Sequence, residues 1–149
     1  MKGIIFVGLQ ASGKSSFFLD RFYKEYLRIN LDMLKTRHRE KIIFDACLKG
    51  KQPCVIDNTN PTMEDRKRYI EAFKVNKFSV DGYFFQSKIS DCLKRNLKRK
   101  GREKLPTIAL KSTRSKLEIP KYSEGFDNLY YVSITSGGFD VEEWKNEIQ

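Results

Sequence analysis

Residues 4–15 of the chain, Ile4-Ile5-Phe6-Val7-Gly8-Leu9-Gln10-Ala11-Ser12-Gly13-Lys14-Ser15, join a short apolar run to a glycine-containing loop. The run from Ile4 to Val7 predicts a strand that is buried on both faces, as is typical of parallel sheets. The loop from Gly8 to Ser15 matches the pattern Gly-x-x-x-x-Gly-Lys-Ser/Thr at every fixed position. Because a helical pattern of aromatic residues follows, the loop stands between a strand and a helix, which is the setting of a phosphate-binding loop (P-loop).

A P-loop holds phosphate oxygens with inward-pointing backbone N–H groups and with the positive end of the helix that follows. Lys14 is expected to reach the β- and γ-phosphates of ATP, and Ser15 to offer its hydroxyl to Mg²⁺. The loop does not define the phosphoryl acceptor, although the absence of an Asn-Lys-x-Asp motif argues against a GTPase. The residues expected to bind the nucleotide here are Gly8, Ala11, Ser12, Gly13, Lys14, Ser15 and Ser16.

Apolar runs alternate with helix-like stretches along the rest of the chain, which predicts an α/β fold with a mainly parallel sheet flanked by helices. With no linker or repeat, residues 1–149 are expected to form one domain. A short amphipathic end is expected at Val141, Trp144 and Ile148. The five predicted strands cover residues 4–7, 27–29, 54–56, 80–85 and 129–134, and the predicted helices follow Gly13, span 40–48, follow Thr62, follow Ser87 and span 107–117.

The composition excludes several classes of protein. Of 149 residues, 40% are hydrophobic and 13% aromatic, which argues against disorder. Apolar stretches are too short to cross a bilayer or to form a signal peptide. Cys47, Cys54 and Cys92 form no Cys-x-x-Cys pair, so neither a disulfide framework nor a zinc site is predicted. We expect a soluble, cytoplasmic protein without membrane contact.

The net charge of +10 is concentrated in one segment. Between Lys94 and Lys116, Glu103 is the one acidic residue among ten Lys and Arg residues. Such a segment attracts polyanions such as nucleic acid, although a charge run is also compatible with a plain solvated helix face. We expect a basic helical lid over about residues 88–120. Within it, Arg95 and Arg99 are spaced to share one helix face and, with Arg102, to contact donor phosphates.

Two aspartates follow predicted strands. Asp32 closes the run that begins at Leu27, so it should lie at the carboxyl edge of the sheet, where ligands bind. There it could accept the proton of an attacking hydroxyl, and the alternative is a helix N-cap. Asp57 follows Cys54-Val55-Ile56 and could hold Mg²⁺ together with Ser15, and the alternative is a turn-forming residue.

Four segments taken in order resemble the kinase domain of the 5′-hydroxyl polynucleotide kinases. They are the P-loop, Ile29–Lys35 with its Asn-x-Asp pattern, Val55–Thr62 with its Asp-x-Thr-Asn pattern, and Arg95–Arg99 leading into Pro106. Ile119-Pro120 and Glu124–Asp127 are also similar to segments of that family.

The resemblance implies a P-loop kinase fold that uses ATP and Mg²⁺ to phosphorylate the 5′-hydroxyl end of RNA or DNA. It makes Lys14, Asp32 and Arg99 the catalytic residues, with Asp32 as the general base. Where the family often has an acceptor-binding Arg, this chain has Lys35, which binds phosphate as a point charge, with Arg37 nearby. The expected acceptor-binding residues are Asp32, Lys35, Arg37, Asn58, Thr59 and Asn60.

Other functions stay open at this stage. The chain lacks an Asp-x-Asp-x-Thr/Val motif, so 3′-phosphatase activity is not expected, and a separate ligase or phosphatase is a reasonable functional partner. The alternatives are a P-loop kinase of a small hydroxyl metabolite and a nucleotide-dependent nucleic-acid-binding protein without catalysis. The residues do not define the oligomeric state.

Overall fold

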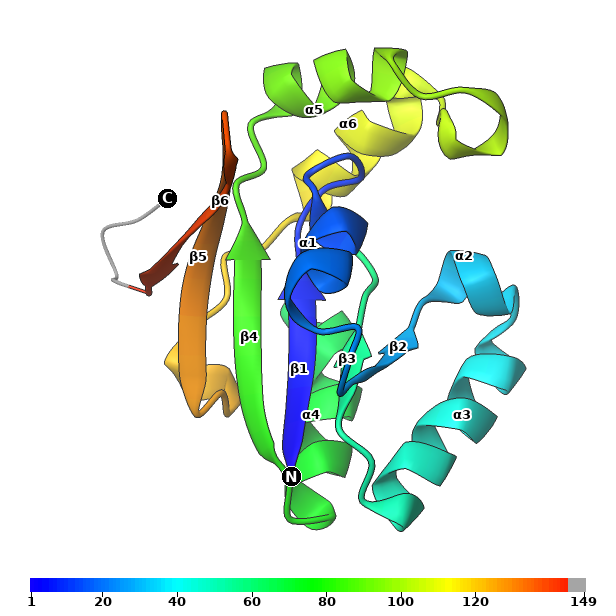
Figure 1. The fold of residues 1–149 in the computed structure, drawn as a ribbon, viewed down its shortest axis with the longest axis vertical. Coiled ribbons are helices and arrows are strands. Elements are labelled where there is room, and N and C mark those ends of the chain that lie inside the picture. The colour runs from blue at the N-terminus through cyan, green and yellow to red at the C-terminus, as the bar shows by residue number, and fades with distance from the viewer. Residues whose placement is uncertain (145–149) are drawn as a thin grey trace.

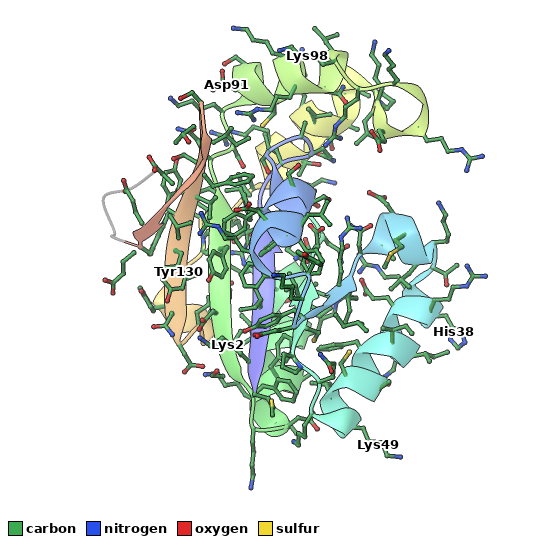
Figure 2. The ribbon with its side chains drawn as sticks, viewed as in Figure 1. Lys2, His38, Lys49, Asp91, Lys98 and Tyr130 are labelled. Carbon is green, nitrogen blue, oxygen red and sulfur yellow. The ribbon has the colours of Figure 1, made fainter. Side chains whose placement is uncertain are left out.

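The structure, a computed structural model, describes residues 1–144 and reveals a sheet with helices on both faces (Figure 1; side chains in Figure 2). The N-terminal half contains β1 (Lys2–Val7), α1 (Lys14–Arg21), β2 (Leu27–Ile29), α2 (Leu31–Leu34), α3 (Arg37–Gly50), β3 (Cys54–Ile56) and α4 (Met63–Val75). The remainder contains β4 (Ser79–Phe85), α5 (Ile89–Leu97), the 3₁₀ turn η1 (Gly101–Glu103), α6 (Thr107–Lys116), the 3₁₀ turn η2 (Tyr122–Glu124), β5 (Asn128–Thr135) and β6 (Gly138–Glu143).

The strands form a six-stranded sheet with the order β2-β3-β1-β4-β5-β6. The pairs that join β2 to β5 are parallel, which confirms the predicted α/β class. The prediction of five strands was wrong because β6 returns antiparallel along β5 after a turn at Ser136-Gly137. This hairpin covers the backbone groups of β5 that an edge strand would expose. Of the expected amphipathic end, Val141 lies in β6, and Ile148 lies outside the described residues.

The alternation of side chains along β1 builds two cores. Ile5 and Val7 face α3 and α4, in a cluster that includes Phe44 and Phe73. The alternate residues, Ile4 and Phe6, face α1 on the other side of the sheet, where they pack in an aromatic cluster. A continuous apolar run is therefore required at β1, since both of its faces are buried.

The segment 88–120 forms the helical cover seen above the P-loop in Figure 1. Its apolar cluster pairs Cys92 and Leu110 with the P-loop residue Leu9, so α5 and α6 are packed directly on that loop. The N-cap of α5 is Lys88, and Ser87 does not cap the helix. Its hydroxyl instead accepts a hydrogen bond from the N–H of Leu9 at 3.1 Å and donates one to the carbonyl of Phe85 at 2.8 Å.

The helix α5 ends earlier than the sequence pattern suggested. Its last helical residue is Leu97, so Arg95 lies in the helix and Arg99 lies beyond it. The prediction that these arginines share a helix face was therefore wrong. The side chain of Asn96 explains the early end, because its amide donates to the carbonyl of Leu105 at 2.7 Å and its oxygen accepts from the N–H of Leu105 at 3.0 Å. Within residues 1–144, no helix has the length and apolar character needed to span a bilayer.

Candidate active site

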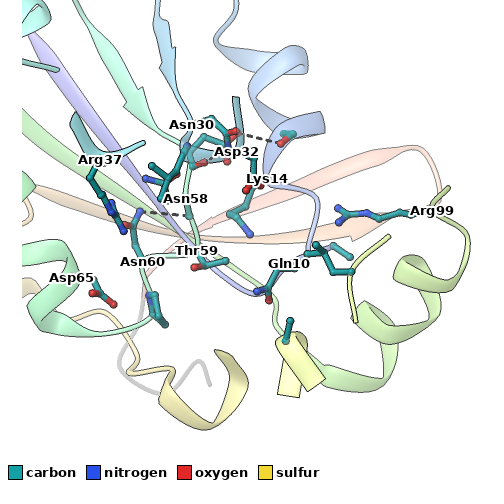
Figure 3. Close-up of a pocket in the computed structure, with 17 residues that line it drawn as sticks. Gln10, Lys14, Asn30, Asp32, Arg37, Asn58, Thr59, Asn60, Asp65 and Arg99 are labelled. Carbon is teal, nitrogen blue, oxygen red and sulfur yellow. Dashed lines mark hydrogen bonds between the residues drawn. The ribbon is translucent and has the colours of Figure 1, made fainter. Parts of the chain in front are cut away.

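A cleft of about 370 Å³ lies at the carboxyl ends of β1, β2 and β3 (Figure 3). Ligands bind at this edge in open parallel sheets because the loops there, not the strands, supply the side chains. The P-loop, the loop after β2, the loop after β3 and the segment after α5 contribute to its walls. The predicted site residues that line it are Ala11, Lys14, Ser15, Asp32, Arg37, Asp57, Asn58, Thr59, Asn60 and Arg99.

A second cavity, of about 780 Å³, opens from the same place. It shares Ser15, Asp32 and Arg99 with the first cleft, so the two form one continuous hollow. The predicted residues Ser16, Lys35 and Arg102 line this second part. The hollow therefore extends from the P-loop towards α2 on one side and towards the segment after α5 on the other.

The P-loop owes its shape to residues with unusual backbone angles. Gly13, the N-cap of α1, has a φ of 98°, and Ala11 has a φ of 62°, both in the left-handed region. At Gly8 a Cβ atom would lie 3.0 Å from the Ser12 hydroxyl and from the Cβ of Phe85. The N–H of Gly8 donates to the carbonyl of Thr59 at 3.0 Å, which joins the P-loop to the loop after β3.

Lys14 is buried inside the P-loop. Its Nζ donates to the carbonyls of Gly8 at 2.9 Å and Leu9 at 2.5 Å, and lies 3.4 Å from the hydroxyl of Ser12. Removal of the ammonium from water lowers the pKa of Lys14 from 10.5 to about 8, and the negative charge of Asp57 acts in the opposite direction. A bound polyphosphate would favour the charged amine.

Ser15 and Asp57 come together as predicted. The Ser15 hydroxyl donates to Oδ2 of Asp57 at 3.2 Å, and Asp57 is 1% exposed. An alcohol and a carboxylate beside a phosphate-binding loop are the oxygen ligands that suit Mg²⁺, which usually takes its remaining ligands from water and substrate. The donor set therefore fits the ion. The Asp57 carboxylate is bound by Ser15 and by Arg28, so it does more than form a turn, which was the alternative interpretation.

Arg28, on β2, contacts both of these groups. Its Nε donates to Oδ2 of Asp57 at 2.8 Å, and its Nη2 donates to the Ser15 hydroxyl at 2.8 Å. The guanidinium supplies the positive charge that a buried carboxylate needs. A metal ion at Oδ2 of Asp57 would have to replace or share this contact.

Asp32 lies in the first turn of α2, at the rim of the cleft. The N-cap of that helix is Asn30, whose side-chain oxygen accepts from the N–H of Met33 at 2.9 Å. The alternative assignment of Asp32 as the N-cap was therefore wrong. The Asn30 amide also donates to the carbonyl of Asp57 at 2.6 Å, so α2 is fixed to the end of β3.

The loop after β3 holds the remaining predicted acceptor residues in different ways. Asn58 bonds to α2 and α3, and Thr59 bonds through its carbonyl to the P-loop. The Asn60 amide donates to the carbonyl of Phe6 at 2.8 Å and is buried, so this group is used by the fold. The exposed Arg37 donates to Glu40 at 3.0 Å while it lines the cleft.

The three predicted donor-phosphate arginines have separate positions. Arg99 points into the cleft from the side opposite Asn58 in Figure 3, and its Nη1 donates to the carbonyl of Glu103 at 3.2 Å. Arg102, in η1, lines the second cavity. Arg95 does not line either cavity, since its Nη1 donates to the carbonyl of Ala11 at 3.0 Å and supports the P-loop.

Sequence reasoning missed three residues that organise this site. Arg28 was hidden inside a strand, although a charged residue between Leu27 and Ile29 is the one signal that could have marked it. Gln10 donates to the Thr113 hydroxyl of α6 at 2.9 Å and so connects the P-loop with its cover. Glu40 lies on α3 and is buried, and two of its partners, Asn58 and Tyr69, come from distant segments.

The fold and the site define a P-loop kinase domain: a parallel sheet, a P-loop between β1 and α1, a carboxylate opposite it and a helical cover. Residues 4–120 match the AAA_33 family, described as an AAA domain, and the chain belongs to that family. The chain is 32% identical over 133 residues to a bifunctional polynucleotide phosphatase/kinase of Schizosaccharomyces pombe. The aligned region covers 87% of this chain and 33% of the relative. The resemblance seen in the sequence is thereby confirmed.

Solved structures show the same fold. A gluconokinase from Sinorhizobium meliloti 1021 has a TM-score of 0.65 at 19% identity, over 89% of this chain and 82% of that one. The AvrRxo1-ORF1:-ORF2 structure with ATP has a TM-score of 0.70 at 13% identity, over 95% of this chain and 57% of that one. The chain spans about a third of the length of the curated relatives it matches.

Proposed function

We propose that the protein transfers the γ-phosphoryl group of ATP to the 5′-hydroxyl end of a polynucleotide. The observation that carries this proposal is the position of Asp32 in one cleft with the P-loop residues Lys14 and Ser15. A site that only bound nucleotide would need no carboxylate opposite its phosphate loop. The name of the S. pombe relative supports a polynucleotide as the acceptor.

In this mechanism Asp32 is the general base. Its carboxylate accepts the proton of the 5′-hydroxyl while that oxygen attacks the γ-phosphorus and the bond to the β–γ bridging oxygen breaks. The exposed position of Asp32 at the rim leaves space for a strand end to approach. Lys14 and Arg99 lie on the P-loop and on the segment after α5, so they place positive charge around the transferring group.

Ser15 and Asp57 are the residues that would hold Mg²⁺, and the ion would neutralise charge on the β- and γ-phosphate oxygens when bound. Arg28 must then give up or share its contact with Oδ2 of Asp57. Lys14 would release at least one of its present contacts with the P-loop in order to donate to the phosphates. Backbone N–H groups of residues 8–15 orient the donor.

The acceptor side carries positive charge suited to a polyanion. Lys35 and Arg37 are exposed at the rim near Asp32, and Arg102 is exposed on the opposite wall. Their attraction for an oligonucleotide should weaken as salt is raised. Binding releases cations from the phosphate backbone, and this release becomes less favourable at a higher salt concentration. A small neutral metabolite as acceptor would show no comparable salt dependence.

The test is a transfer assay with γ-labelled ATP. The acceptors are 5′-hydroxyl RNA and DNA oligonucleotides, the same oligonucleotides carrying a 5′-phosphate, and a panel of small hydroxyl compounds. We expect label on the 5′-hydroxyl oligonucleotides only. Efficient labelling of a small compound, with none on any oligonucleotide, would identify a metabolite kinase instead, and ATP binding without transfer to any acceptor would indicate a nucleotide-dependent binder.

A further inference from the structure

Glu40 is a buried carboxylate that the mechanism above does not use. It lies on α3, is 4% exposed, and accepts hydrogen bonds at both oxygens. The Tyr69 hydroxyl donates to Oε1 at 2.8 Å, and Nη1 of Arg37 donates to the same oxygen at 3.0 Å. The side-chain amide of Asn58 donates to Oε2 at 2.9 Å. The carboxylate therefore gathers donors from α3, α4 and the loop after β3.

The Asn58 side chain continues this chain of contacts into the cleft. Its Oδ1 accepts a hydrogen bond from the backbone N–H of Leu31 at 2.9 Å. Leu31 is the first residue of α2, so this N–H is one of those that a helix leaves without an internal acceptor. The next residue is Asp32. Two hydrogen bonds thus connect Glu40 with the short helix that carries the proposed base.

The order of donors and acceptors gives Glu40 a specific task. An ionised carboxylate only accepts hydrogen bonds, whereas an amide has a donor end and an acceptor end. Glu40 therefore fixes the NH₂ end of Asn58 towards itself and the oxygen end towards Leu31. If the Asn58 amide were turned over, oxygen would face oxygen at Glu40 and NH₂ would face N–H at Leu31. A neutral amide at position 40 would weaken this preference, because only the N–H of Leu31 would still discriminate fully between the two ends of the Asn58 amide.

We infer that Glu40 is a positioning residue for the acceptor half of the site. It orients Asn58, which holds α2 and Asp32 in place, and it restrains Arg37 at the rim. This inference rests on the proposed function for its catalytic readout. It concerns phosphoryl transfer and acceptor binding, and it leaves the P-loop unaffected, since none of the contacts of Glu40 involves residues 8–15.

The primary test is Glu40→Gln in the full chain. The new amide offers one accepting oxygen to three donors, so the restraint that Glu40 places on the orientation of Asn58 is weakened. We expect the turnover number to fall about 10- to 100-fold and the KM for the 5′-hydroxyl oligonucleotide to rise, the usual scale when a supporting contact is lost. The Kd for ADP should stay within about twofold of wild type, since the phosphate loop is untouched.

The matched control is Asp45→Asn. It makes the same acid-to-amide change on α3, at an exposed residue paired with Lys41. We expect wild-type kinetics from this variant. A merely structural role of Glu40 would change the melting temperature but would not separate the turnover number from the Kd for ADP. Equal kinetics for the variants at positions 40 and 45 would overturn the inference.

A second variant restores the pattern of donors and acceptors. In Glu40→Gln/Asn58→Asp, the new amide can donate to a carboxylate at position 58, which still accepts from the N–H of Leu31. The net charge is that of wild type. We expect the turnover number of the double variant to be at least about tenfold higher than that of Glu40→Gln. A double variant no more active than the single one would overturn the inference.

A third readout does not depend on catalysis. The amide proton of Leu31 is held by Asn58 alone among the contacts described for residues 1–144, so its exchange with solvent reports the orientation of that side chain. In nuclear magnetic resonance exchange experiments it should exchange about tenfold faster in Glu40→Gln but not in Asp45→Asn. Unchanged exchange would refute the positioning role. A wild-type protein that transfers nothing to oligonucleotides would instead refute the proposed function.

Discussion

The buried amine of Lys14 should make nucleotide binding depend on pH in a predictable direction. Its pKa is lowered to about 8 by removal from water, and the phosphates of a bound nucleotide would raise it again. The affinity for the nucleotide should therefore be highest below about pH 8. It should fall as the pH rises from the pKa of Lys14 in the free protein to the higher pKa of Lys14 in the complex. Between about pH 7 and pH 9 the protonated fraction of such an amine falls about tenfold, and the affinity should fall with it.

The assay is the Kd of ADP measured by titration calorimetry across this range, for wild type and for Lys14→Met. The nucleotide titrates in the same way with both proteins, so the ratio of their affinities isolates the amine. We expect this ratio to fall about tenfold, equivalent to about 1.4 kcal/mol of binding free energy. Parallel curves for the two proteins would refute the argument, because the charge of Lys14 would then contribute nothing to phosphate binding in this range.

Three further changes test the site and the fold. Asp32→Asn should reduce the turnover number at least about 100-fold while the Kd for ATP stays near wild type, and single-turnover transfer at the wild-type rate would exclude a general base there. Arg99→Ala should reduce the turnover number about 100-fold, and this loss should persist at high salt because Arg99 lines the cleft. Lys100→Ala should not show this loss, since Lys100 does not line the cleft. Equal losses for the two variants that disappear at high salt would indicate a diffuse basic patch. Gly3→Ala should lower the free energy of unfolding in urea by about 1–3 kcal/mol, because the added Cβ would lie 2.4 Å from the buried ring of Phe73 on α4. Gly50→Ala should not lower it, since a Cβ there meets nothing within 4 Å. Similar urea midpoints for the two variants would contradict the packing argument.

Much of the fold could be predicted because its signals are local. The apolar runs at β1 and β3 are buried on both faces, and the predicted bounds of β2 and β3 agree with the structure. The hairpin strand β6 was missed because Val141 and Trp144 stand three residues apart, which also suits a helix. The unpaired edge of β5 decided in favour of a strand, and no local pattern reveals that edge.

The site divides in the same way. Sequence motifs predicted that Lys14, Ser15, Asp32 and Asp57 would share one cleft, because strand ends and the P-loop locate them. The contacts of Arg28 could not be predicted from the sequence. Asp57 lies 29 positions away and Ser15 lies 13 positions away, and only the folded sheet brings both side chains to Arg28. The early end of α5 likewise depends on a contact of Asn96 with Leu105, which a helical pattern does not reveal.

Another buried pair constrains how this sequence can change. Arg66, which is 0% exposed, donates from Nε and Nη2 to the two oxygens of Glu124 at 2.8 and 3.0 Å, and from Nη1 to the carbonyl of Asn60 at 2.9 Å. Replacement of either charged partner alone would leave an uncompensated charge in the interior, at a cost of about 3–5 kcal/mol. Positions 66 and 124 should therefore change together among related sequences, and a designer who wishes to alter the loop at Asn60 must treat two segments 58 positions apart as one unit.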